Sequence, residues 1–420
     1  MAPRSPIRQG IPLTLADLQE ARAALAPAIL PTPLWVNDAL SRELGASIHL
    51  KLENLQRTGS FKLRGATYKL DRLLAAGRGR SGLIAASAGN HAQGVARAAM
   101  MAGVPVTVVM PVGASLTKIE SCRSLGAEVI LSGLSLEEAR LEAQRIAAER
   151  TLEFIHPYDD WEIIAGQASV GLEIIEAMPD VSLLVVPLGG GGLLAGIALA
   201  VKLQRPDVRV VGVQSEAVAP FRHFLKDGRI DAVAAEAHTI ADGIKVKIPG
   251  VLTQRVIAAY VDEIITVDDN AIAEAIVTLL ERTRTIGEGA GVVGLAALMK
   301  RLIVPHTGDK VAVVISGGNA DMTLVGRSID FGLASSGRLM SVAVTLPDTP
   351  GRLAQLLGIV AAHGMNVRHV EHRRGELHVP VGFTEVILQI ETRDPSHQQE
   401  LLLHFAEQGV LARNLLAPLA

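Results

Sequence analysis

Short segments that are apolar throughout, each followed by a segment with helical spacing of its apolar positions, alternate along most of this chain. In chain order the apolar segments are Gly82–Ser87, Val106–Met110, Glu128–Leu131, Ser182–Pro187, Val208–Val213 and Lys310–Ile315. The helical patterns that follow the first three are His91–Met101, Leu116–Leu125 and Leu136–Arg150. Strands that are apolar on both faces and alternate with helices are typical of parallel sheets covered by helices on both sides. The pattern therefore predicts an α/β fold up to about residue 325, with open parallel sheets in two lobes. The small lobe, at about residues 77–156, is expected to be inserted in the large one.

Three patterns precede the first of these strands. Residues 13–29 are amphipathic, and Thr14 is placed to cap a helix. Residues 47–52 alternate as a strand does, and residues 62–76 have the spacing of a helix with Leu63 and Leu70 on one face.

The composition changes after residue 325. Serine and glycine are frequent at residues 326–339, which predicts a linker. The segments that follow read in the order βαββαβ: Met340–Leu346, Gly351–His363, Asn366–Arg373, Glu385–Glu391, Ser396–Gln408 and a last short strand. This order is that of the ferredoxin-like arrangement. Residues 340–420 are therefore expected to form a separate small domain.

Composition and charge narrow the class of protein. A chain of 420 residues suggests two or three domains, and 49% hydrophobic residues with only 3% aromatic residues predict aliphatic cores. A net charge of −3 gives no basic excess, so nucleic acid is not an expected partner. The single cysteine, Cys122, excludes an internal disulfide and fits a reducing, cytoplasmic compartment.

Two segments are candidate membrane signals, and neither has the required pattern. Residues 1–10 lack the apolar core of a signal peptide. Val181–Val201 is apolar, uncharged and long enough for a membrane span, but Pro187 and four consecutive glycines interrupt it. It is better divided into a short strand and a helix, and no membrane partner is expected.

A glycine-rich loop follows the strand that ends at Pro187. Gly189, Gly190, Gly191 and Gly192 precede Leu193 and a helical pattern. Backbone N–H groups of such a loop, together with the helix N-terminus, can bind a phosphate. The spacing Gly190-x-Gly192-x-x-Ala195 also fits a dinucleotide fingerprint, with Glu216 near the place of a ribose-binding acid. Close strand–helix packing without a ligand is the third interpretation, and the loop alone does not decide among them.

Two further loops follow apolar strands. Ser87, Ala88, Gly89, Asn90 and His91 lie between a strand and a helix, where amides and the Asn90 side chain could hold a carboxylate or a hydroxyl. His91 reads more readily as a capping or buried residue than as a catalytic one. Ser316 ends the strand Lys310–Ile315, where its hydroxyl could meet a ring nitrogen, although such a serine alone is most often part of a turn. The spacing of His, Cys and acidic residues predicts no metal site.

Lys62 gives these loops a common chemistry. It follows Phe61 in the stretch Lys51–Ala66, and alone it would read as a solvated lysine at the start of a helix. A lysine for an aldehyde, a loop for a phosphate and a serine for a ring nitrogen are together what pyridoxal 5'-phosphate requires.

The ordered set of motifs resembles the threonine dehydratases (threonine ammonia-lyases) of the tryptophan-synthase-β-like family of pyridoxal-phosphate enzymes, over nearly the whole chain. The motifs are Lys51–Ala66, Ser87–Gly94, Gly189–Leu193, Ala241–Ile244 and Ser316–Asn319. Each is weak alone, but the order and spacing are specific.

The resemblance implies a role for each candidate residue. Lys62 is expected to be the Schiff-base lysine and the base for the Cα proton, with Phe61 beside the ring. Asn90 would bond the ring hydroxyl, Gly189–Gly192 with Leu193 would hold the phosphate, and Ser316 would meet the pyridine nitrogen. The loop Ser87–His91 would hold the substrate carboxylate. The implied reaction is the β-elimination of L-threonine, and also of L-serine.

Residues 340–420 resemble an ACT domain. Leu346–Leu353, His363–Val367 and Val370–Arg373 match its pattern. Such domains pair and bind amino acids near the first strand–helix loop, which implies an isoleucine or valine effector and a homodimer or homotetramer. The implied effector residues are Asp348, Gly351, Leu353, Asn366 and Val367. A domain that only dimerises is the alternative, and a biosynthetic or catabolic role stays open.

Three other functions compete with dehydration. Serine racemases share most of these motifs but carry a second base, a serine, where this chain has Ala88. Gln214 and Pro220 stand where that group has divalent-cation ligands, so no such metal is expected. An amino-acid sensor without catalysis is disfavoured because Lys62, Asn90 and Ser316 are all present. A nicotinamide dehydrogenase would need a ribose-binding acid and would show no visible cofactor band.

Overall fold

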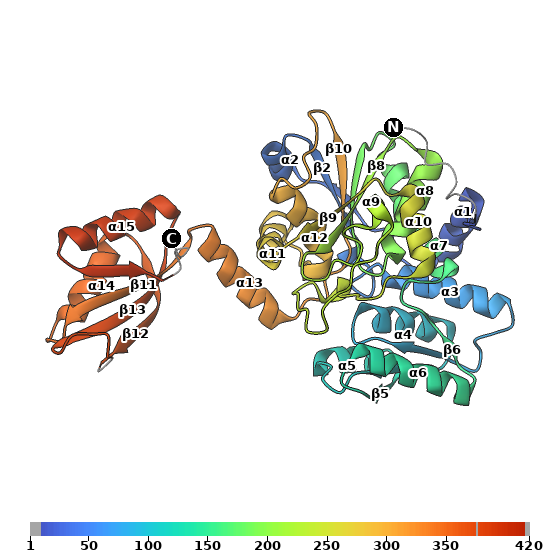
Figure 1. Ribbon diagram of the computed structural model, residues 1–420, viewed down its shortest axis with the longest axis horizontal. Helices are drawn as coiled ribbons and strands as arrows, with labels where there is room; N and C mark the ends of the chain where they lie inside the picture. The colour runs from blue at the N-terminus through green and yellow to red at the C-terminus, as the bar shows by residue number, and fades with distance from the viewer. Residues whose placement is uncertain (1–9, 375–376, 416–420) are drawn as a thin grey trace. The chain divides into compact units, whose positions relative to one another are not determined.

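The computed structural model describes residues 10–374 and 377–415, and the chain divides into two compact units, Met1–Met322 and Thr323–Ala420 (Figure 1). The N-terminal unit contains two separate sheets, and the C-terminal unit contains one. The two sheets of the N-terminal unit confirm the predicted two-lobed α/β fold, and the third confirms the predicted small α+β arrangement. Among the described residues, no helix is long and apolar enough to cross a membrane.

The large sheet of the N-terminal unit has six strands in the order β1-β2-β10-β7-β8-β9. Its strands are β1 Leu34–Val36, β2 Ser47–Leu52, β7 Leu183–Pro187, β8 Arg209–Ser215, β9 Glu263–Val267 and β10 Lys310–Ile315. All neighbours run parallel except β1, an antiparallel edge strand on β2 that the sequence pattern did not predict.

The small sheet is wholly parallel and has the order β5-β4-β3-β6. Its strands are β3 Leu83–Ala86, β4 Val106–Met110, β5 Glu128–Leu131 and β6 Glu153–Phe154. The helices that accompany it are α4 Asn90–Ala102, α5 Leu116–Ser124 and α6 Leu136–Arg150. These elements occupy the stretch in which the inserted small lobe was expected.

The other helices of the N-terminal unit surround the large sheet. They are α1 Leu15–Leu25, α2 Asp38–Leu44, α3 Lys62–Ala75, α7 Trp161–Ala177, α8 Gly192–Gln204, α9 Phe224–Asp227, α10 Val251–Tyr260, α11 Asp269–Thr283 and α12 Gly289–Met299. Short 3₁₀ turns lie at η1 Glu53–Leu55 and η2 Asp242–Ile244. Thr14 caps α1 as predicted, since its hydroxyl accepts from the N–H of Asp17.

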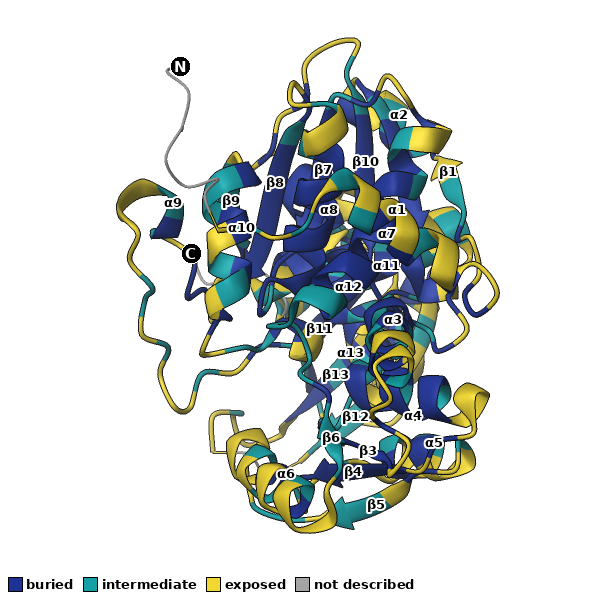
Figure 2. Cartoon of the chain, turned by 90° about the vertical axis from the view of Figure 1, so that its right-hand side faces the viewer, coloured by how far each residue is buried: buried dark blue, intermediate teal, exposed yellow. Residues whose placement is uncertain are grey.

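Successive residues of the central strands enter two different cores. In β7, Leu184 and Val186 pack with α1, α7 and α8, whereas Leu183 and Val185 pack with α11 and α12. All four side chains are buried, and Figure 2 shows the strands in the middle of this sheet in dark blue. Because both faces are covered, the strands have no polar positions to alternate with apolar ones.

Glycine allows α3, which begins at Lys62, to lie close to two neighbouring helices. A Cβ on Gly166 of α7 would lie 2.7 Å from the Cα of Gly65, and one on Gly94 of α4 would lie 3.0 Å from the carbonyl carbon of Lys62. Side chains at these positions would push the helices apart. The first turn of α3 is therefore held between a helix of each lobe.

The C-terminal unit has an antiparallel sheet of order β12-β13-β11-β14. Its elements are α13 Met322–Ser335, β11 Leu339–Pro347, α14 Arg352–Ala362, β12 Asn366–Arg373, β13 Phe383–Glu391, α15 Pro395–Glu407 and β14 Leu411–Asn414. Apolar side chains of β11, β13, α14 and α15 form its core. The βαββαβ order is as predicted.

The serine- and glycine-rich stretch 326–339 is not an irregular linker, because most of it belongs to α13. The buried residues of this helix, Val325, Ser328 and Gly332, are spaced three and four apart, as one face of a helix requires. Small side chains on that face gave the stretch the composition of a linker. The boundary between the units lies between Met322 and Thr323, at the first residue of this helix.

Candidate active site

Lys62 is the first residue of α3, and its side chain reaches the segment that follows β6. Its Nζ donates to the carbonyl oxygen of Pro157 at 2.9 Å and lies 5.1 Å from the centre of the Phe61 ring. Loss of hydration lowers the pKa of the amine to about 8, against a smaller opposing effect of the nearby Glu288 carboxyl group. A minor fraction of the amine is therefore neutral at pH 7, far more than for an ordinary lysine, and the neutral form is the one that acts as a nucleophile or base.

The loop before Lys62 is tied to the loop that contains Ser316. Ser60 and Gly317 form an antiparallel bridge, the N–H of Phe61 donates to the carbonyl of Ser316 at 3.1 Å, and that of Gly318 donates to Gly59 at 2.9 Å. β2 and β10 are parallel neighbours that end in register at Leu52 and Ile315. Both loops thus leave the same edge of the sheet, where ligands bind in open α/β folds.

Asn90 is brought to these loops from the other sheet. Its Oδ1 accepts from Asn319 Nδ2 at 2.7 Å, and its Nδ2 donates to Glu288 Oε1 at 2.5 Å. Asn319 follows Ser316 in the loop after β10, and the N–H of Glu288 donates to the carbonyl of Gly317. Hydrogen bonds therefore join the first residue of α4 to the carboxyl end of the large sheet.

The other residues of the Ser87–His91 loop make hydrogen bonds close to the loop itself. His91 is buried, and its Nε2 lies 2.9 Å from the carbonyl oxygen of Ile155. Loss of hydration and the nearby Lys62 amine lower its pKa to about 3, which keeps the ring neutral. The hydroxyl of Ser87 accepts from the N–H of Gly89, while Ala88 offers no polar side-chain atom. The structure therefore makes His91 a buried structural residue, the interpretation that its sequence context favoured.

The glycine loop Gly189–Gly192 lies between the end of β7 and the start of α8. Gly191 has φ +100°, a conformation that favours glycine, and no side chain caps the N-terminus of α8. A Cβ on Gly190 would overlap the Tyr158 ring, and one on Gly191 would lie 2.7 Å from Thr253 Cβ. The loop therefore needs glycine for packing as well as for its backbone conformation, and the first N–H groups of α8 stay available to an anion.

The segment from His156 to Asp160 connects Lys62 with the glycine loop. Pro157 accepts from Lys62, and the next residue, Tyr158, packs against Gly190 and Gly192. The carboxylate of Asp159 accepts from the N–H groups of Val251 and Leu252 at the start of α10. This segment had no recognisable motif, so sequence reasoning missed it.

A buried ion cluster lies beneath the first turn of α3. Arg64 donates to Glu53 at 2.8 Å and to Glu173 at 2.6 Å, and Lys51 pairs with the same Glu173. The side chains of Arg64 and Glu53 are fully buried. Two positive and two negative groups balance, so the cluster binds α3, the end of β2 and α7 together without leaving an unpaired charge.

Glu288 is the acidic residue that sequence reasoning missed. Loss of hydration raises its pKa to about 7, against the opposing effects of the Asn90 hydrogen bond and of the Lys118 and Lys62 charges, while Asp242 adds to the rise. The glycine-rich stretch Gly287–Gly291, with one acid at a helix start, was the available signal. Among the described residues, no group of three His, Cys, Asp or Glu side chains could hold a metal ion.

Comparison with known proteins identifies the group of enzymes that shares this arrangement. The family model for pyridoxal-phosphate dependent enzymes matches residues 25–317, and the ACT domain model matches residues 340–401. The chain belongs to the pyridoxal-phosphate dependent enzymes. Its cofactor is accordingly pyridoxal 5'-phosphate, as the motifs predicted.

Similar proteins include a threonine ammonia-lyase, a threonine deaminase and a serine racemase. The chain is 47% identical over 389 residues to the L-threonine ammonia-lyase of Thermotoga maritima, covering 93% of this chain and 96% of that protein. Among solved structures, the processed form of threonine deaminase isoform 2 from Solanum lycopersicum is 31% identical with a TM-score of 0.71, covering 76% of this chain and 88% of that one. Maize serine racemase is 31% identical with a TM-score of 0.70, covering 76% and 98%.

The groups gathered around Lys62 fit the cofactor of this family. A partly neutral amine suits an aldehyde, and uncapped N–H groups at the start of α8 suit a phosphate. Ser60 is fully buried, and its hydroxyl has no partner among the described residues, as expected of a polar atom beside a site for a polar group. The donor set therefore matches pyridoxal phosphate in chemical type.

The implied effector residues of the C-terminal unit do not all lie together. Asp348, Gly351 and Leu353 line a hollow of about 380 Å³ near the loop between β11 and α14. Asn366 pairs with Glu391, opposite the first residue of β11, so Asn366 and Val367 lie at the other end of the sheet. Nine residues of β11 separate the two ends by roughly 25 Å. One copy of the unit cannot gather all five residues around one amino acid.

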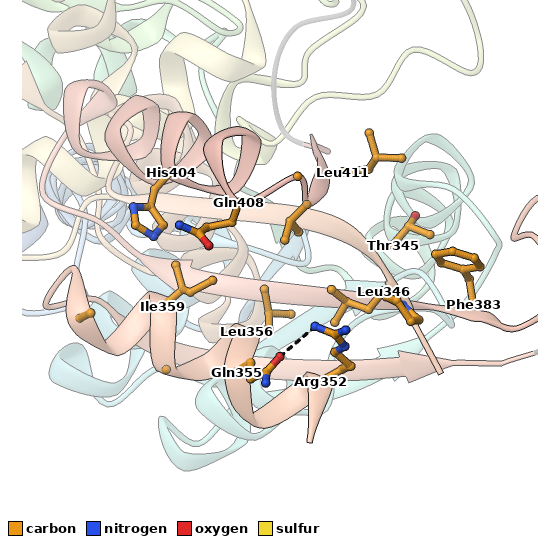
Figure 3. Close-up of a pocket in the computed structure, with 15 residues that line it drawn as sticks. Thr345, Leu346, Arg352, Gln355, Leu356, Ile359, Phe383, His404, Gln408 and Leu411 are labelled. Carbon is orange, nitrogen blue, oxygen red and sulfur yellow. Dashed lines mark hydrogen bonds between the residues drawn. The ribbon is translucent and has the colours of Figure 1, made fainter. Parts of the chain in front are cut away.

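A second hollow, of about 640 Å³, lies beside α14 and α15. Figure 3 shows Leu356, Ile359 and Leu411 along it, with Arg352 donating to Gln355 at one end. The sequence interpretation assigned no residue to this hollow.

Proposed function

We propose that this chain is a pyridoxal-phosphate dependent enzyme that dehydrates and deaminates L-threonine to 2-oxobutanoate and ammonia. The observation that carries the proposal is the partly neutral Lys62 amine, held by one carbonyl oxygen beside the Ser316 and Asn90 loops. Similarity to a full-length L-threonine ammonia-lyase supports the choice of reaction. The second substrate is L-serine, yielding pyruvate, because one methyl group is worth only about 1–3 kcal/mol of discrimination.

The proposal assigns a role to each residue of the site. Lys62 would hold the cofactor aldehyde, with Phe61 beside the ring. The backbone of Gly189–Leu193 would bind the phosphate, Asn90 the ring hydroxyl, and Ser316 the pyridine nitrogen. The loop from Ser87 to His91 would bind the substrate carboxylate through its backbone N–H groups and the Ser87 hydroxyl.

The reaction removes a proton from Cα and a hydroxyl group from Cβ. Pyridoxal phosphate supplies the electron sink that makes the Cα proton acidic. Lys62, once its nitrogen is free and neutral, takes that proton. The hydroxyl leaves as water after gaining a proton, and hydrolysis of the resulting enamine gives the oxo acid and ammonia. The neutral hydroxyl of Ser316 does not hold a proton on the ring nitrogen, which favours prompt loss of the β-hydroxyl group.

Racemisation is disfavoured by Ala88. A racemase must carry protons on both faces of Cα, and Ala88 has no group that can carry one. His91, three residues further on, is held neutral and paired with the carbonyl of Ile155. Neither position therefore offers a second base in addition to Lys62.

The C-terminal unit is proposed to bind an amino-acid effector, with isoleucine and valine as the first candidates, in a homodimer or homotetramer. The match to the ACT domain supports this assignment. The division of the predicted effector residues between two ends of one sheet also favours a site that two copies complete.

A steady-state assay tests the proposed reaction. Purified protein with pyridoxal phosphate and L-threonine should release 2-oxobutanoate and ammonia in equal amounts, and isoleucine or valine should change the rate. Absence of 2-oxobutanoate from protein that binds the cofactor would reject threonine as substrate. A rate unaffected by either amino acid would reject the proposed effectors alone.

A further inference from the structure

One backbone carbonyl determines which atoms donate and which accept in the hydrogen bonds around Asn90. Asn319 Nδ2 donates to the carbonyl oxygen of Thr58 at 2.8 Å, and a carbonyl can only accept. The nitrogen end of the Asn319 amide therefore faces this side, where it also reaches Asn90 Oδ1 at 2.7 Å and Gln93 Oε1 at 3.3 Å. Asn90 must then present its oxygen to Asn319 and its nitrogen away from it.

Glu288 fixes the same orientation of the Asn90 amide, from the nitrogen end. Its Oε1 accepts from Asn90 Nδ2 at 2.5 Å. A carboxyl group retains an acceptor oxygen whether it is ionised or protonated, so this bond survives the titration of Glu288 near neutral pH. Each of the three hydrogen bonds, to Glu288, Asn90 and Thr58, therefore joins an amide N–H donor to an oxygen acceptor.

The same residues are held against Gly317 and Gly59. A Cβ on Gly317 would touch the Glu288 carboxyl group and lie 3.1 Å from Asn90 Nδ2, and one on Gly59 would overlap Asn319 Oδ1. The two amides and the carboxyl group thus have little room to turn. Among the described residues, no acceptor other than Glu288 is paired with Asn90 Nδ2, which leaves its second N–H uncommitted.

We propose that Glu288 and Asn319 are positioning residues that lock the Asn90 amide in one orientation, so that its uncommitted N–H can donate only to an anionic or acceptor oxygen of the cofactor. This inference rests on the proposed assignment of Asn90 to the ring hydroxyl. It assigns Glu288 a role through Asn90, and it makes Asn90 a permanent donor. A permanent donor favours the deprotonated ring oxygen.

Variants of Glu288 separate orientation from charge and from mere packing. Glu288→Gln keeps an acceptor oxygen for Asn90 but removes the charge, whereas Glu288→Met fills similar space without a strong acceptor. The measurements are the dissociation constant of pyridoxal phosphate, titrated into resolved protein, and the visible spectrum of the loaded protein between pH 6 and 9.

The proposal expects Glu288→Gln to bind the cofactor within about threefold of the parent and Glu288→Met to bind about 10- to 100-fold more weakly, with an altered spectrum. In an Asn90→Ala background, Glu288→Met should cost little more, because it acts through Asn90. Equal losses in Gln and Met variants would overturn the proposal, since charge would then be the cause. So would a Met variant with unchanged affinity and spectrum.

Asn319→Asp keeps the test decisive if Glu288→Met does not fold. It has the same shape but sets an oxygen against Thr58 and Asn90, and it should weaken cofactor binding and alter the spectrum as the Met variant does. Unchanged affinity and spectrum in this variant would contradict the proposal. Threonine turnover by the parent protein is scored separately, so failure of the proposed reaction and failure of this inference are distinguishable.

Discussion

Lys62 Nζ donates to the carbonyl oxygen of Pro157 across 95 positions of the chain. The bond links the start of α3 to the segment that leaves the small sheet after β6. The next residue, Tyr158, lies against the glycine loop of the large sheet. The segment from Pro157 to Tyr158 therefore positions both the Lys62 amine and the glycine loop. A change at either contact should alter cofactor binding.

Gly190→Ala should weaken cofactor binding by at least about tenfold. The new Cβ would overlap the Tyr158 ring, so either the ring or the glycine loop must move. Titration of pyridoxal phosphate into resolved protein measures the effect. Gly113→Ala is the control, because a Cβ there meets nothing within 4 Å and should leave affinity unchanged. Equal affinities in the two variants would show that the loop does not bind the phosphate.

Arg64→Met should lower the free energy of unfolding by about 3–5 kcal/mol, because it leaves buried carboxylates at Glu53 and Glu173 without their main partner. Chemical denaturation measures this change. Arg72→Met on the same helix is the control, since its ion pair with Glu20 is exposed and worth about 0–1 kcal/mol. If both variants lose the same small amount, the buried cluster does not hold α3.

The pKa of Glu288 predicts a pH-dependent difference in stability. The folded protein holds this carboxyl group at a pKa of about 7, against 4.5 in the unfolded chain. Between these values the unfolded chain releases the proton first, so stability falls as pH rises from about 4.5 to 7 and is level above that. The Glu288→Gln protein has no carboxyl group at this position, so its stability should not fall for this reason.

The measurement is chemical denaturation of cofactor-free parent and Glu288→Gln proteins at pH 5 and pH 8. Relative to the variant, the parent should be less stable at pH 8 than at pH 5. A difference in stability between the two proteins that does not change with pH would mean that Glu288 ionises normally.

The strands and most helices of the fold could be predicted because both faces of each sheet are buried. Apolar runs such as Val106–Met110 and Lys310–Ile315 coincide with β4 and β10 at both ends. α13 was misread because its buried face uses Ser328 and Gly332, small residues that also suit a linker. β1 is a three-residue edge strand, too short for alternation to show.

The site was partly readable for a different reason. Lys62, Asn90 and the glycine loop stand beside strand ends, where position in the chain predicts position in the sheet. Glu288 and Pro157 have no such marker, since they reach the site through hydrogen bonds to residues far away in the chain. Their roles depend on how the two sheets are placed, which local patterns do not carry.

Replacement of Lys62 tests the proposed function most directly. Parent protein should absorb near 410–420 nm, as cofactor bound to a lysine roughly does, and the band should change when L-threonine is added while 2-oxobutanoate is released. Lys62→Ala should lose this band and at least about 10²-fold in turnover. Arg72→Ala, on the same helix and with only an exposed ion pair to Glu20, should keep both. A Lys62→Ala protein with the parent's absorption and normal threonine turnover would contradict the assignment.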